Sequence, residues 1–298
     1  MKSQSPKTME VLQSIREIRQ AIARRGGGRV VLVPTMGALH EGHRSLIEEG
    51  RDLAGEDGVL VVSVFVNPTQ FGVGEDFQAY PRTLDADRAL CEEAGVDLIF
   101  APSTKEMYSP NHSVKVTEDS VTIHLCGASR PGHFSGVCTV VAKLFNIVRP
   151  DVAVFGKKDA QQLAVIRRMV RDLNFPVEVV GVDTVREDSG LAMSSRNQYL
   201  DDEMRNDAAV LWQALCAAEH EFFQGERSVS VLVDIATKLI STVDEARIDY
   251  VEIVDRDTFQ PIVEIQSDAV MALAVFFGGT RLIDNIDLNI EDCLSNLV

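Results

Sequence analysis

Two histidines three residues apart, His40 and His43, follow an apolar run, Val30 to Val33, that is typical of a buried strand. Where such a strand leads into a helix, the first N–H groups of the helix are unpaired and attract an anion. Gly42, between the two histidines, lets an anion come close to the backbone. Two imidazoles on one helical turn can donate hydrogen bonds to phosphate oxygens as negative charge builds up on a leaving group. The segment therefore predicts phosphate chemistry.

A second polar segment, Met193 to Asn197, lies far from the histidines in the chain and precedes another predicted helix. Ser194 and Ser195 supply hydroxyl and backbone donors, and Arg196 adds a permanent cation whose planar fork suits phosphate. A loop of this kind can fold over a triphosphate and tighten during a reaction. Alone, the segment would be a solvated turn before a helix. Together with the histidine segment, it predicts that two distant segments of the chain bind one triphosphate from opposite sides.

Three further polar side chains are candidates for the same site. Lys158 follows the apolar run Val152 to Phe155, so its compact ammonium group would stand at a strand end and neutralise phosphate; an isolated surface lysine is the alternative. Gln70 and Gln162 each offer an amide donor and acceptor, which together can orient an uncharged substrate with a hydroxyl group. For each glutamine taken singly, ordinary surface solvation is at least as good an explanation. Most of the remaining carboxylates are interpreted as solvated faces.

A metal pair is a rival interpretation of His40 and His43, and surface or helix-capping histidines are another. The H-E-x-x-H spacing of zinc proteases is absent, and no third ligand cluster is evident. The five cysteines are widely scattered and form no C-x-x-C pair, so they read as reduced thiols. The sequence therefore predicts no metal held by protein side chains.

Short runs rich in Val and Ile alternate with stretches of helical period in the first part of the chain, which is typical of a parallel sheet covered by helices on both faces. The run 60–66 is apolar almost throughout, which favours burial on both sides. The predicted strands are Val30–Val33, Val59–Val66, Asp97–Phe100, Val152–Phe155 and Val177–Val180. The predicted helices are Arg44–Leu53, Leu84–Ala94, Gly136–Val148 and Ala160–Leu173. We therefore expect an α/β fold, a Rossmann-like doubly wound parallel sheet.

Ligands of such a sheet sit beyond the carboxyl ends of its strands. Three candidate motifs fall at predicted strand ends: Met36 to His43, Asn67 to Phe71, and Gly156 to Asp159. This convergence predicts a single site.

The pattern changes after about Thr184. A polar loop is followed by two predicted helices and then by clustered strands, which favours a smaller α+β second domain. The expected helices are Asp201–Phe223 and Val229–Thr242, and the expected strands are Ile248–Val254 and Val270–Phe276. We predict one domain at 1–184 and a second at 185–298 that closes over the phosphate site.

The chain has 298 residues, of which 45% are hydrophobic and 25% charged, enough for these two domains and a genuine core. Its formal net charge of −16 argues against a broad nucleic-acid footprint, because phosphate backbones are bound through excess Lys and Arg. The start, Met1 to Arg25, lacks the apolar stretch of a signal peptide, and no run reaches membrane-spanning length. We expect a soluble cytoplasmic protein with neither nucleic-acid nor membrane partners.

Six runs of residues, in order along almost the whole chain, carry a resemblance to one family. They are P-T-M-G-A-L-H-E-G-H, F-V-N-P-T-Q-F, R-P-G-H-F-S-G-V, K-D-A-Q-Q-L, L-A-M-S-S-R-N-Q-Y-L and T-R-L-I-D-N. The chain resembles the pantothenate synthetases, also called pantoate-beta-alanine ligases. The H-x-G-H and M-S-S-R-like elements by themselves are shared more widely, across the nucleotidyltransferase superfamily.

The resemblance implies a homodimeric cytoplasmic enzyme of coenzyme A biosynthesis. It would join (R)-pantoate to beta-alanine with ATP as a substrate and Mg²⁺, and release AMP and pyrophosphate. The pantoate carboxylate would attack the α-phosphate to form pantoyl adenylate, and the amine of beta-alanine would then displace AMP.

The resemblance also implies residue roles. His43 matches the family's proton donor, although stabilisation of charge on phosphate oxygens would demand much the same geometry. Gln70 would contact pantoate and beta-alanine, and Gln162 would hold pantoate. The catalytic residues implied are His40, His43, Lys158, Ser194, Ser195 and Arg196. The ATP contacts implied are Met36, Gly37, Ala38, Leu39, His40, Glu41, Gly42, His43, Gly156, Lys157, Lys158, Asp159, Val185, Met193, Ser194, Ser195 and Arg196.

Two departures from the family pattern are visible. Lys157 stands where members commonly carry Glu, which adds positive charge beside the nucleotide, and Gly278-Gly279 replaces a more usual Gly-Lys. Neither removes a residue on which the chemistry depends.

Two other functions are compatible with such a nucleotide core. One is an adenylyltransferase or aminoacyl-tRNA synthetase; the acidic charge and the absence of an evident anticodon domain weigh against tRNA. The other is a catalytically silent nucleotide-binding module, whose expected mark is loss of His40, His43, Lys158 or the Ser-Ser-Arg loop. All of these are present.

Overall fold

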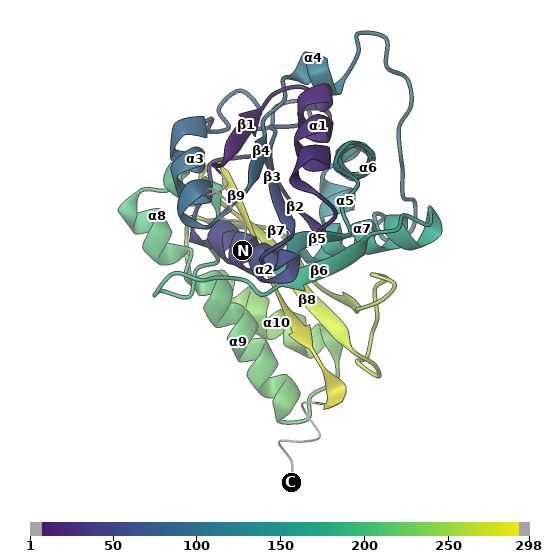
Figure 1. Cartoon of the computed structure of the whole chain (residues 1–298). Helices are drawn as coiled ribbons and strands as arrows, with labels where there is room; N and C mark the ends of the chain where they lie inside the picture. Colours follow the sequence, from purple (N-terminus) through teal and green to yellow (C-terminus); the bar gives the residue numbers. More distant parts are fainter. Residues whose placement is uncertain (1–7, 292–298) are drawn as a thin grey trace. The chain divides into compact units, whose positions relative to one another are not determined.

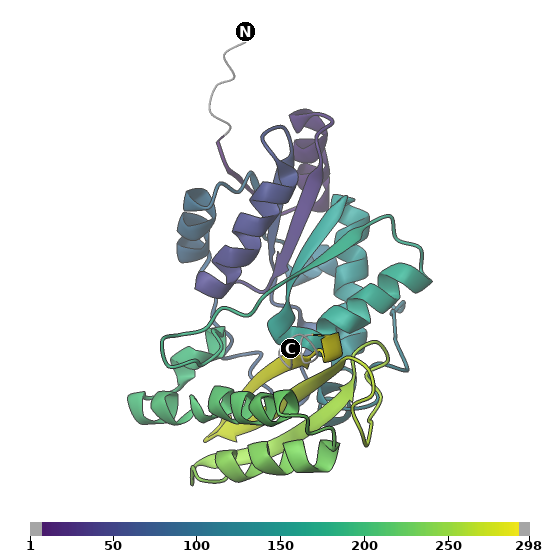
Figure 2. The ribbon, with the colours of Figure 1, turned by 90° about the horizontal axis from the view of Figure 1, so that it is seen from below.

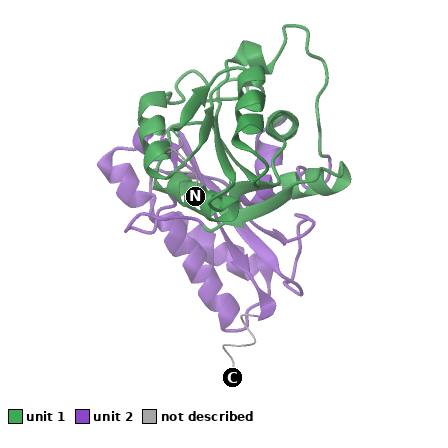
Figure 3. Cartoon of the chain, in the orientation of Figure 1, with its two compact units in different colours: residues 1–118, 132–157, 165–183 green, residues 119–131, 158–164, 184–298 purple. Residues whose placement is uncertain are grey.

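The computed structural model describes residues 8–291, which fold into two compact units (Figure 3). The first unit runs up to Glu118 and includes Gly132–Lys157 and Val165–Asp183. The second consists of Asp119–Pro131, Lys158–Ala164 and the chain from Thr184 onward.

Two segments that lie within the predicted 1–184 domain, 119–131 and 158–164, belong to the second unit. Side chains from late in the chain hold both segments. The Asn285 amide donates to the Lys158 carbonyl at 2.8 Å, and the Gln260 amide donates to the Ser120 carbonyl at 3.0 Å. The two residues of each pair are more than a hundred residues apart in the chain. Local sequence patterns therefore cannot predict these contacts.

A six-stranded sheet forms the centre of the first unit, and every neighbouring pair of its strands is parallel (Figure 1). The strand order is β1-β4-β3-β2-β5-β6. The strands are β1 Glu10–Leu12, β2 Val30–Thr35, β3 Val59–Val64, β4 Leu98–Phe100, β5 Val152–Gly156 and β6 Glu178–Val182. The predicted Rossmann-like doubly wound parallel sheet is therefore confirmed.

Helices cover both faces of this sheet (Figures 1 and 2). α1 packs with α6, whereas α2 packs with α3. In α2, Leu46, Ile47 and Gly50 are buried, and a Cβ on Gly50 would lie 2.9 Å from Leu60 of β3, so helix and sheet are in close contact there. The helices are α1 Ile15–Arg25, α2 Glu41–Ala54, α3 Leu84–Glu93, α4 Thr104–Met107, α6 His133–Val148 and α7 Ala160–Asp172.

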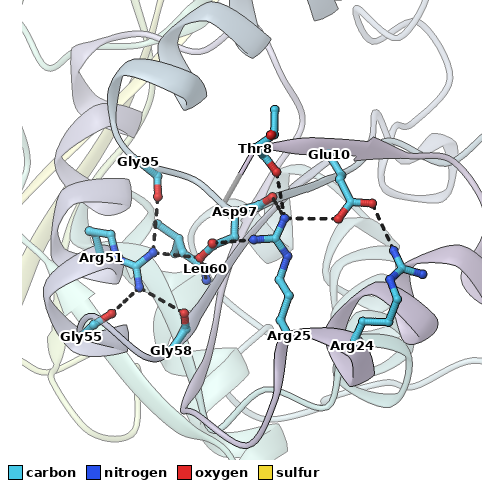
Figure 4. A network of polar contacts seen from close by, with 10 residues as sticks. All are labelled: Thr8, Glu10, Arg24, Arg25, Arg51, Gly55, Gly58, Leu60, Gly95 and Asp97. Carbon is cyan, nitrogen blue, oxygen red and sulfur yellow. Dashed lines mark hydrogen bonds and ion pairs between the residues drawn. The ribbon is translucent and has the colours of Figure 1, made fainter. Parts of the chain in front are cut away.

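A buried carboxylate, Asp97, ties several of these elements together just before β4 (Figure 4). Its two oxygens each accept a guanidinium N–H at 2.8 Å, one from Arg25 at the end of α1 and one from Arg51 in α2. The backbone N–H of Leu60 in β3 adds a bond of 2.9 Å. Arg25 also pairs with Glu10 of the edge strand β1 at 3.2 Å. The network holds the short strand β1 in the sheet.

The second unit contains a three-stranded antiparallel sheet in the order β7-β8-β9, formed by Ala246–Asp255, Ala269–Phe277 and Thr280–Leu288. α9 Val210–Phe223 and α10 Val229–Ile240 pack together, and their apolar residues share one core with β8. α8 Asp202–Asp207 precedes them, and α5 Cys126–Ser129 belongs to the segment 119–131. The predicted smaller α+β domain is confirmed.

Other predicted helices and strands lie within three residues of the observed bounds, but one prediction is wrong. The strands β1 and β9 and the helices α1, α4 and α5 were not predicted. The single helix Asp201–Phe223 is two helices, because Ala209 donates to Asn206 and Leu211 donates to Ala208, each three residues back. These tighter bonds interrupt the α-helical ladder. β1, with three residues, is too short to show a pattern. β9 alternates buried and half-buried residues along Thr280–Leu288, and its polar face hides the strand pattern.

Candidate active site

Three candidate motifs follow neighbouring strands of the first unit. The loops after β3, β2 and β5 begin near Asn67, Met36 and Lys157. Because the strands are parallel, their carboxyl ends share one edge of the sheet. The chain continues from β2 to β3 on one side, and β5 lies on the other side, so the strand order reverses at β2 and β5. Open α/β sheets bind ligands at this kind of position.

The turn after β2 has an unusual backbone conformation. Gly37 and Ala38 both have positive φ angles, of 81° and 51°. A Cβ on Gly37 would lie 2.9 Å from a carboxylate oxygen of Asp87, so the close approach requires glycine. The N–H of Gly37 donates to the Thr35 hydroxyl at 3.2 Å, and those of Ala38 and Leu39 donate to the Asp87 carboxylate at 3.2 and 2.8 Å. Side chains thus bind three successive backbone donors.

His40 and His43 form a reciprocal cap at the start of α2. The Nδ1 of His40 accepts the N–H of Gly42 at 3.1 Å, and the Nδ1 of His43 accepts the N–H of His40 at 3.3 Å. Their ring centroids are 4.1 Å apart. A ring nitrogen that accepts a hydrogen bond carries no hydrogen, so in each neutral ring Nε2 is the donor. Capping therefore occupies one nitrogen of each histidine and fixes the other as an N–H.

Gln70 ends the short helix η1, Pro68–Gln70, which follows β3, and is only 8% exposed. Its Oε1 accepts the Asn67 amide at 3.0 Å, which turns its Nε2 toward the sulfur of Met36 at 3.2 Å. Asn67 in turn accepts the Tyr108 hydroxyl at 2.9 Å. Burial raises the pKa of Tyr108, so this hydroxyl keeps its proton. The amide of Gln70 is thus held in one orientation beside the turn after β2.

Lys157, the residue that departs from the family pattern, forms an ion pair of 2.5 Å with Asp183, which follows β6. Both partners belong to the first unit. Because the carboxylate is 88% exposed, the pair is screened by solvent and is weak, yet it offsets part of the added charge. Lys158 and Asp159 belong to the second unit.

Gln162 is half-buried in the first turn of α7, in the part of the helix that belongs to the second unit. Its neighbour Gln161 is 7% exposed and donates to the carbonyls of Val121 and His124, both at 2.8 Å. The start of α7 is therefore anchored to the segment 119–131.

The Met193 to Arg196 loop of the second unit is also held by local bonds. The N–H of Met193 donates to the Val185 carbonyl at 2.9 Å, which places two predicted ATP contacts side by side. Ser194 caps the short helix η3, Ser195–Tyr199, and its hydroxyl accepts the N–H of Arg196 at 3.2 Å. The loop is thus a defined turn.

Behind this loop, Asn197 is 5% exposed, and its amide donates to Glu187 at 2.8 Å and to the Ala192 carbonyl at 3.2 Å. Arg205 contacts both Glu187 oxygens at 2.9 Å. Burial alone would raise the pKa of Glu187, but the bonds from Arg205 and Asn197 outweigh it and hold that pKa below its ordinary value. The loop therefore rests on an ionised carboxylate.

The first unit thus brings together Met36 to His43, Gln70, Gly156 and Lys157, while the second holds Lys158, Asp159, Gln162, Val185 and Met193 to Arg196. Most of the remaining carboxylates were interpreted as solvated; Asp87, Asp97 and Asp284 are exceptions, at 1%, 7% and 2% exposed. An acidic residue in the first turn of a helix, such as Asp87, is ordinarily explained by its favourable interaction with the helix dipole alone. Asn67 and Asn197 also support the candidate site, and no role was predicted for either. The only signal in the sequence is that both lie inside the recognised motifs.

Within residues 8–291, no group of three or more His, Cys, Asp or Glu side chains is placed to hold a metal ion. In the same part of the chain, no helix combines the length and apolar character needed to cross a membrane.

The doubly wound sheet and the capped histidine pair that follows its central strand β2 define an α/β protein with a candidate site at its strand ends. The family model of pantoate-beta-alanine ligase matches residues 7–287. The chain belongs to the pantoate-beta-alanine ligase family.

Individual relatives agree with this assignment. The pantothenate synthetase of Akkermansia muciniphila is 54% identical over 94% of this chain and 100% of that relative. The crystal structure of pantothenate synthetase from Thermus thermophilus matches with a TM-score of 0.89 and 48% identity, over 94% of this chain and all of that one. The pantoate-beta-alanine ligase of Francisella tularensis, solved with beta-gamma ATP and beta-alanine, matches with a TM-score of 0.75 and 31% identity, over 94% of this chain and 97% of that one.

Proposed function

We propose that this pantoate-beta-alanine ligase joins (R)-pantoate to beta-alanine in two steps. First, a carboxylate oxygen of pantoate attacks the α-phosphorus of ATP, and pyrophosphate leaves with the electrons of the broken P–O bond. Second, the amine of beta-alanine attacks the carbonyl carbon of pantoyl adenylate, AMP leaves, and the new amide nitrogen loses a proton. Pantothenate made in this way supplies coenzyme A biosynthesis.

The observation that carries the proposal is the histidine cap at the start of α2. Because both Nδ1 atoms accept backbone N–H groups, the Nε2–H groups of His40 and His43 are the donors. In the first step, negative charge moves onto the departing pyrophosphate, and donors at a helix start stabilise such charge. His43 serves as the proton donor or charge stabiliser, and His40 acts beside it.

We assign ATP binding to residues of both units on the strength of the family resemblance and of their chemistry. In the first unit these are Met36 to His43, Gly156 and Lys157; in the second they are Lys158, Asp159, Val185 and Met193 to Arg196. Lys158, Ser194, Ser195 and Arg196 join the histidines in catalysis, since their cationic and hydroxyl groups suit phosphate oxygens. The second domain would close over the bound ATP.

Gln70 and Gln162 are assigned to the organic substrates. The amide of Gln70 is already oriented by Asn67, so it can discriminate between donor and acceptor groups of pantoate and of the incoming beta-alanine. Gln162 would hold pantoate.

Magnesium would enter with ATP as part of the substrate. The assigned phosphate-binding side chains are mostly histidine, lysine, serine and arginine, which donate to phosphate but suit Mg²⁺ poorly. Mg²⁺ commonly keeps several waters and binds substrate phosphates, so phosphate oxygens would hold it here.

Two further properties follow from the family resemblance and are proposed with it. The enzyme would be a homodimer, and it would work in the cytoplasm, where its nucleotide substrate is made available. Size-exclusion chromatography with light scattering tests the first, and fractionation of cells tests the second.

The reaction is tested by incubation with ATP, magnesium, pantoate and beta-alanine, with each omitted in turn. Pyrophosphate must appear without beta-alanine, and AMP with pantothenate only when the amine is present. Pantoate labelled with ¹⁸O in its carboxylate must pass one labelled oxygen to AMP. A stable adenylylated product in place of AMP would instead identify an adenylyltransferase and end the proposal.

The histidine assignment is tested with His40→Gln and His43→Gln, each expected to slow pyrophosphate release by about 10²- to 10³-fold. His220→Gln is the matched control, because His220 is exposed in α9 and lies outside the proposed site. Unchanged rates in both histidine variants would refute the assignment.

A further inference from the structure

A buried carboxylate with no assigned role binds the turn that leads to the histidines. We propose that Asp87 is a positioning residue for adenylate formation, which holds the Gly37–Leu39 turn so that His40 is presented correctly at the start of α2. This inference rests on the proposed roles of His40 and His43.

The carboxylate makes three hydrogen bonds, and two of them go to the turn. Its Oδ2 accepts the N–H of Ala38 at 3.2 Å, and its Oδ1 accepts the N–H of Leu39 at 2.8 Å. The third bond comes from the Thr83 hydroxyl, 3.2 Å from Oδ1. Asp87 therefore links the first turn of α3 to the residues just before His40.

The turn needs a group of this kind because its backbone is strained. Ala38 has a φ of 51°, a left-handed conformation that residues with a Cβ rarely adopt. Such a conformation persists only when the surroundings impose it, and it is commonly found at functional sites. The two N–H groups that Asp87 binds belong to this residue and to the next, so the carboxylate fixes the strained residue from both of its sides.

Negative charge and the absence of a donor are both essential to this role. A carboxylate offers two acceptor oxygens and no hydrogen, which matches two adjacent N–H groups. An asparagine would keep one oxygen and turn an NH₂ group toward the other N–H. Within residues 8–291 Asp87 makes no ion pair with Lys, Arg or His, although it is only 1% exposed. The turn, the Thr83 hydroxyl and the N-terminal end of α3 are therefore what stabilise its charge.

The turn is coupled to the histidines through consecutive backbone groups. The N–H of Leu39 is fixed by Asp87, and the next N–H, that of His40, is fixed by the Nδ1 of His43 at 3.3 Å. A displaced turn therefore also disturbs the cap that sets the tautomer of His43. Misplacement of a reacting group by about 1 Å can cost about 10²-fold in rate.

The test is Asp87→Asn in the full-length enzyme, measured by steady-state pyrophosphate release and by thermal unfolding. We expect kcat to fall about 10- to 100-fold while KM for ATP stays within about threefold, because the histidines act on charge that develops in the transition state. The imidazole ¹⁵N spectrum of His43 should also lose its single Nε2–H tautomer.

Two controls separate positioning from folding. Thr83→Ala removes only the third hydrogen bond of Asp87, and its kcat should stay within about twofold of wild type. Asp97→Asn removes another buried carboxylate of the same unit, at the other end of the strands. It should lower the unfolding temperature while its kcat per folded molecule stays unchanged.

Each outcome decides the question. Asp87→Asn with kcat within twofold of wild type, or with unchanged imidazole spectra, overturns the proposal. A variant that only lowers the unfolding temperature, as Asp97→Asn does, also overturns it. Activity kept in His40→Gln and His43→Gln would instead refute the proposed function, whatever Asp87→Asn does.

A second variant is measured if Asp87→Asn does not fold. Ala38→Gly removes the Cβ from the left-handed position, so the double variant tolerates loss of the carboxylate better. If kcat of the double variant is at least tenfold below that of Ala38→Gly alone, the proposal is supported. A kcat within twofold of that of Ala38→Gly overturns it. A double variant that still fails to fold assigns Asp87 to folding and likewise overturns it.

Discussion

Replacement of Asp97 by asparagine probes how the first unit is held together at the amino ends of its strands. The substitution keeps the shape of the side chain and removes its charge. It leaves the guanidinium groups of Arg25 and Arg51 without the carboxylate that both contact at 2.8 Å. It also turns an amide NH₂ toward one of the groups that now donate to Asp97, namely Arg25, Arg51 and the N–H of Leu60.

The size of the effect follows from burial. Breaking a fully buried ion pair by removing one partner costs about 3–5 kcal/mol. Asp97 and Arg25 have side chains that are each 9% exposed, but that of Arg51 is 28% exposed, and Arg25 keeps its contact with Glu10. We therefore expect a loss of about 2–3 kcal/mol in the free energy of unfolding of the first unit. This loss corresponds to a fall of about 5 to 10 °C in its unfolding temperature.

The assay is urea unfolding followed by circular dichroism, with the midpoint and slope compared between variants. Arg24→Gln is the matched control: Arg24 pairs with Glu10 in the same network, but its side chain is 60% exposed. Its effect should stay within about 0.5 kcal/mol. An Asp97→Asn variant as stable as Arg24→Gln would refute the view that this network holds the sheet.

Three other predictions follow from single contacts. Gly37→Ala should lower kcat at least tenfold, because its Cβ would lie 2.9 Å from the Asp87 carboxylate at a φ of 81°; a kcat within twofold of wild type contradicts this. Lys157→Glu should raise KM for ATP, because it places a second acid beside Asp183 and the nucleotide; an unchanged KM defeats the prediction. The lowered pKa of Glu187 means that its contribution to stability is full above its ordinary value of 4.5 and is lost as pH falls through the lowered value. Glu187→Gln should therefore flatten the stability profile below about pH 4.5, and an identical profile would contradict this.

The sequence by itself determined the architecture of the first unit and the position of the candidate motifs at its strand ends. The strands β3, β4 and β5 are buried along almost their whole length, so apolar residues fill nearly every position, as in β3. The motifs follow such runs directly, and parallel pairing brings strand ends together without further information. The resemblance then supplied the family, because its six runs extend over almost the whole chain.

Sequence patterns did not predict the secondary structure correctly at β9 and between α8 and α9. β9 carries Arg281, Asp284 and Asp287 between its apolar residues, so its alternation resembles a polar loop as much as a strand. The two alanines at 208–209 favour a continuous helix by propensity, yet hydrogen bonds to the third residue back separate α8 from α9 there. Packing of the buried Ala208 and Leu211 overrides the preference of the isolated segment.

Only the tertiary structure decided which polar side chains support the site. In the sequence, Asp87 is one of several acids in a helical segment, alike in charge to Asp85 nearby. Folding buries Asp87 against backbone groups 48 and 49 residues away and leaves Asp85 exposed. A residue's type and spacing state which bonds it can make, whereas its free energy of ionisation and its partners depend on what surrounds it. That surrounding is assembled from distant segments, so no local pattern encodes it.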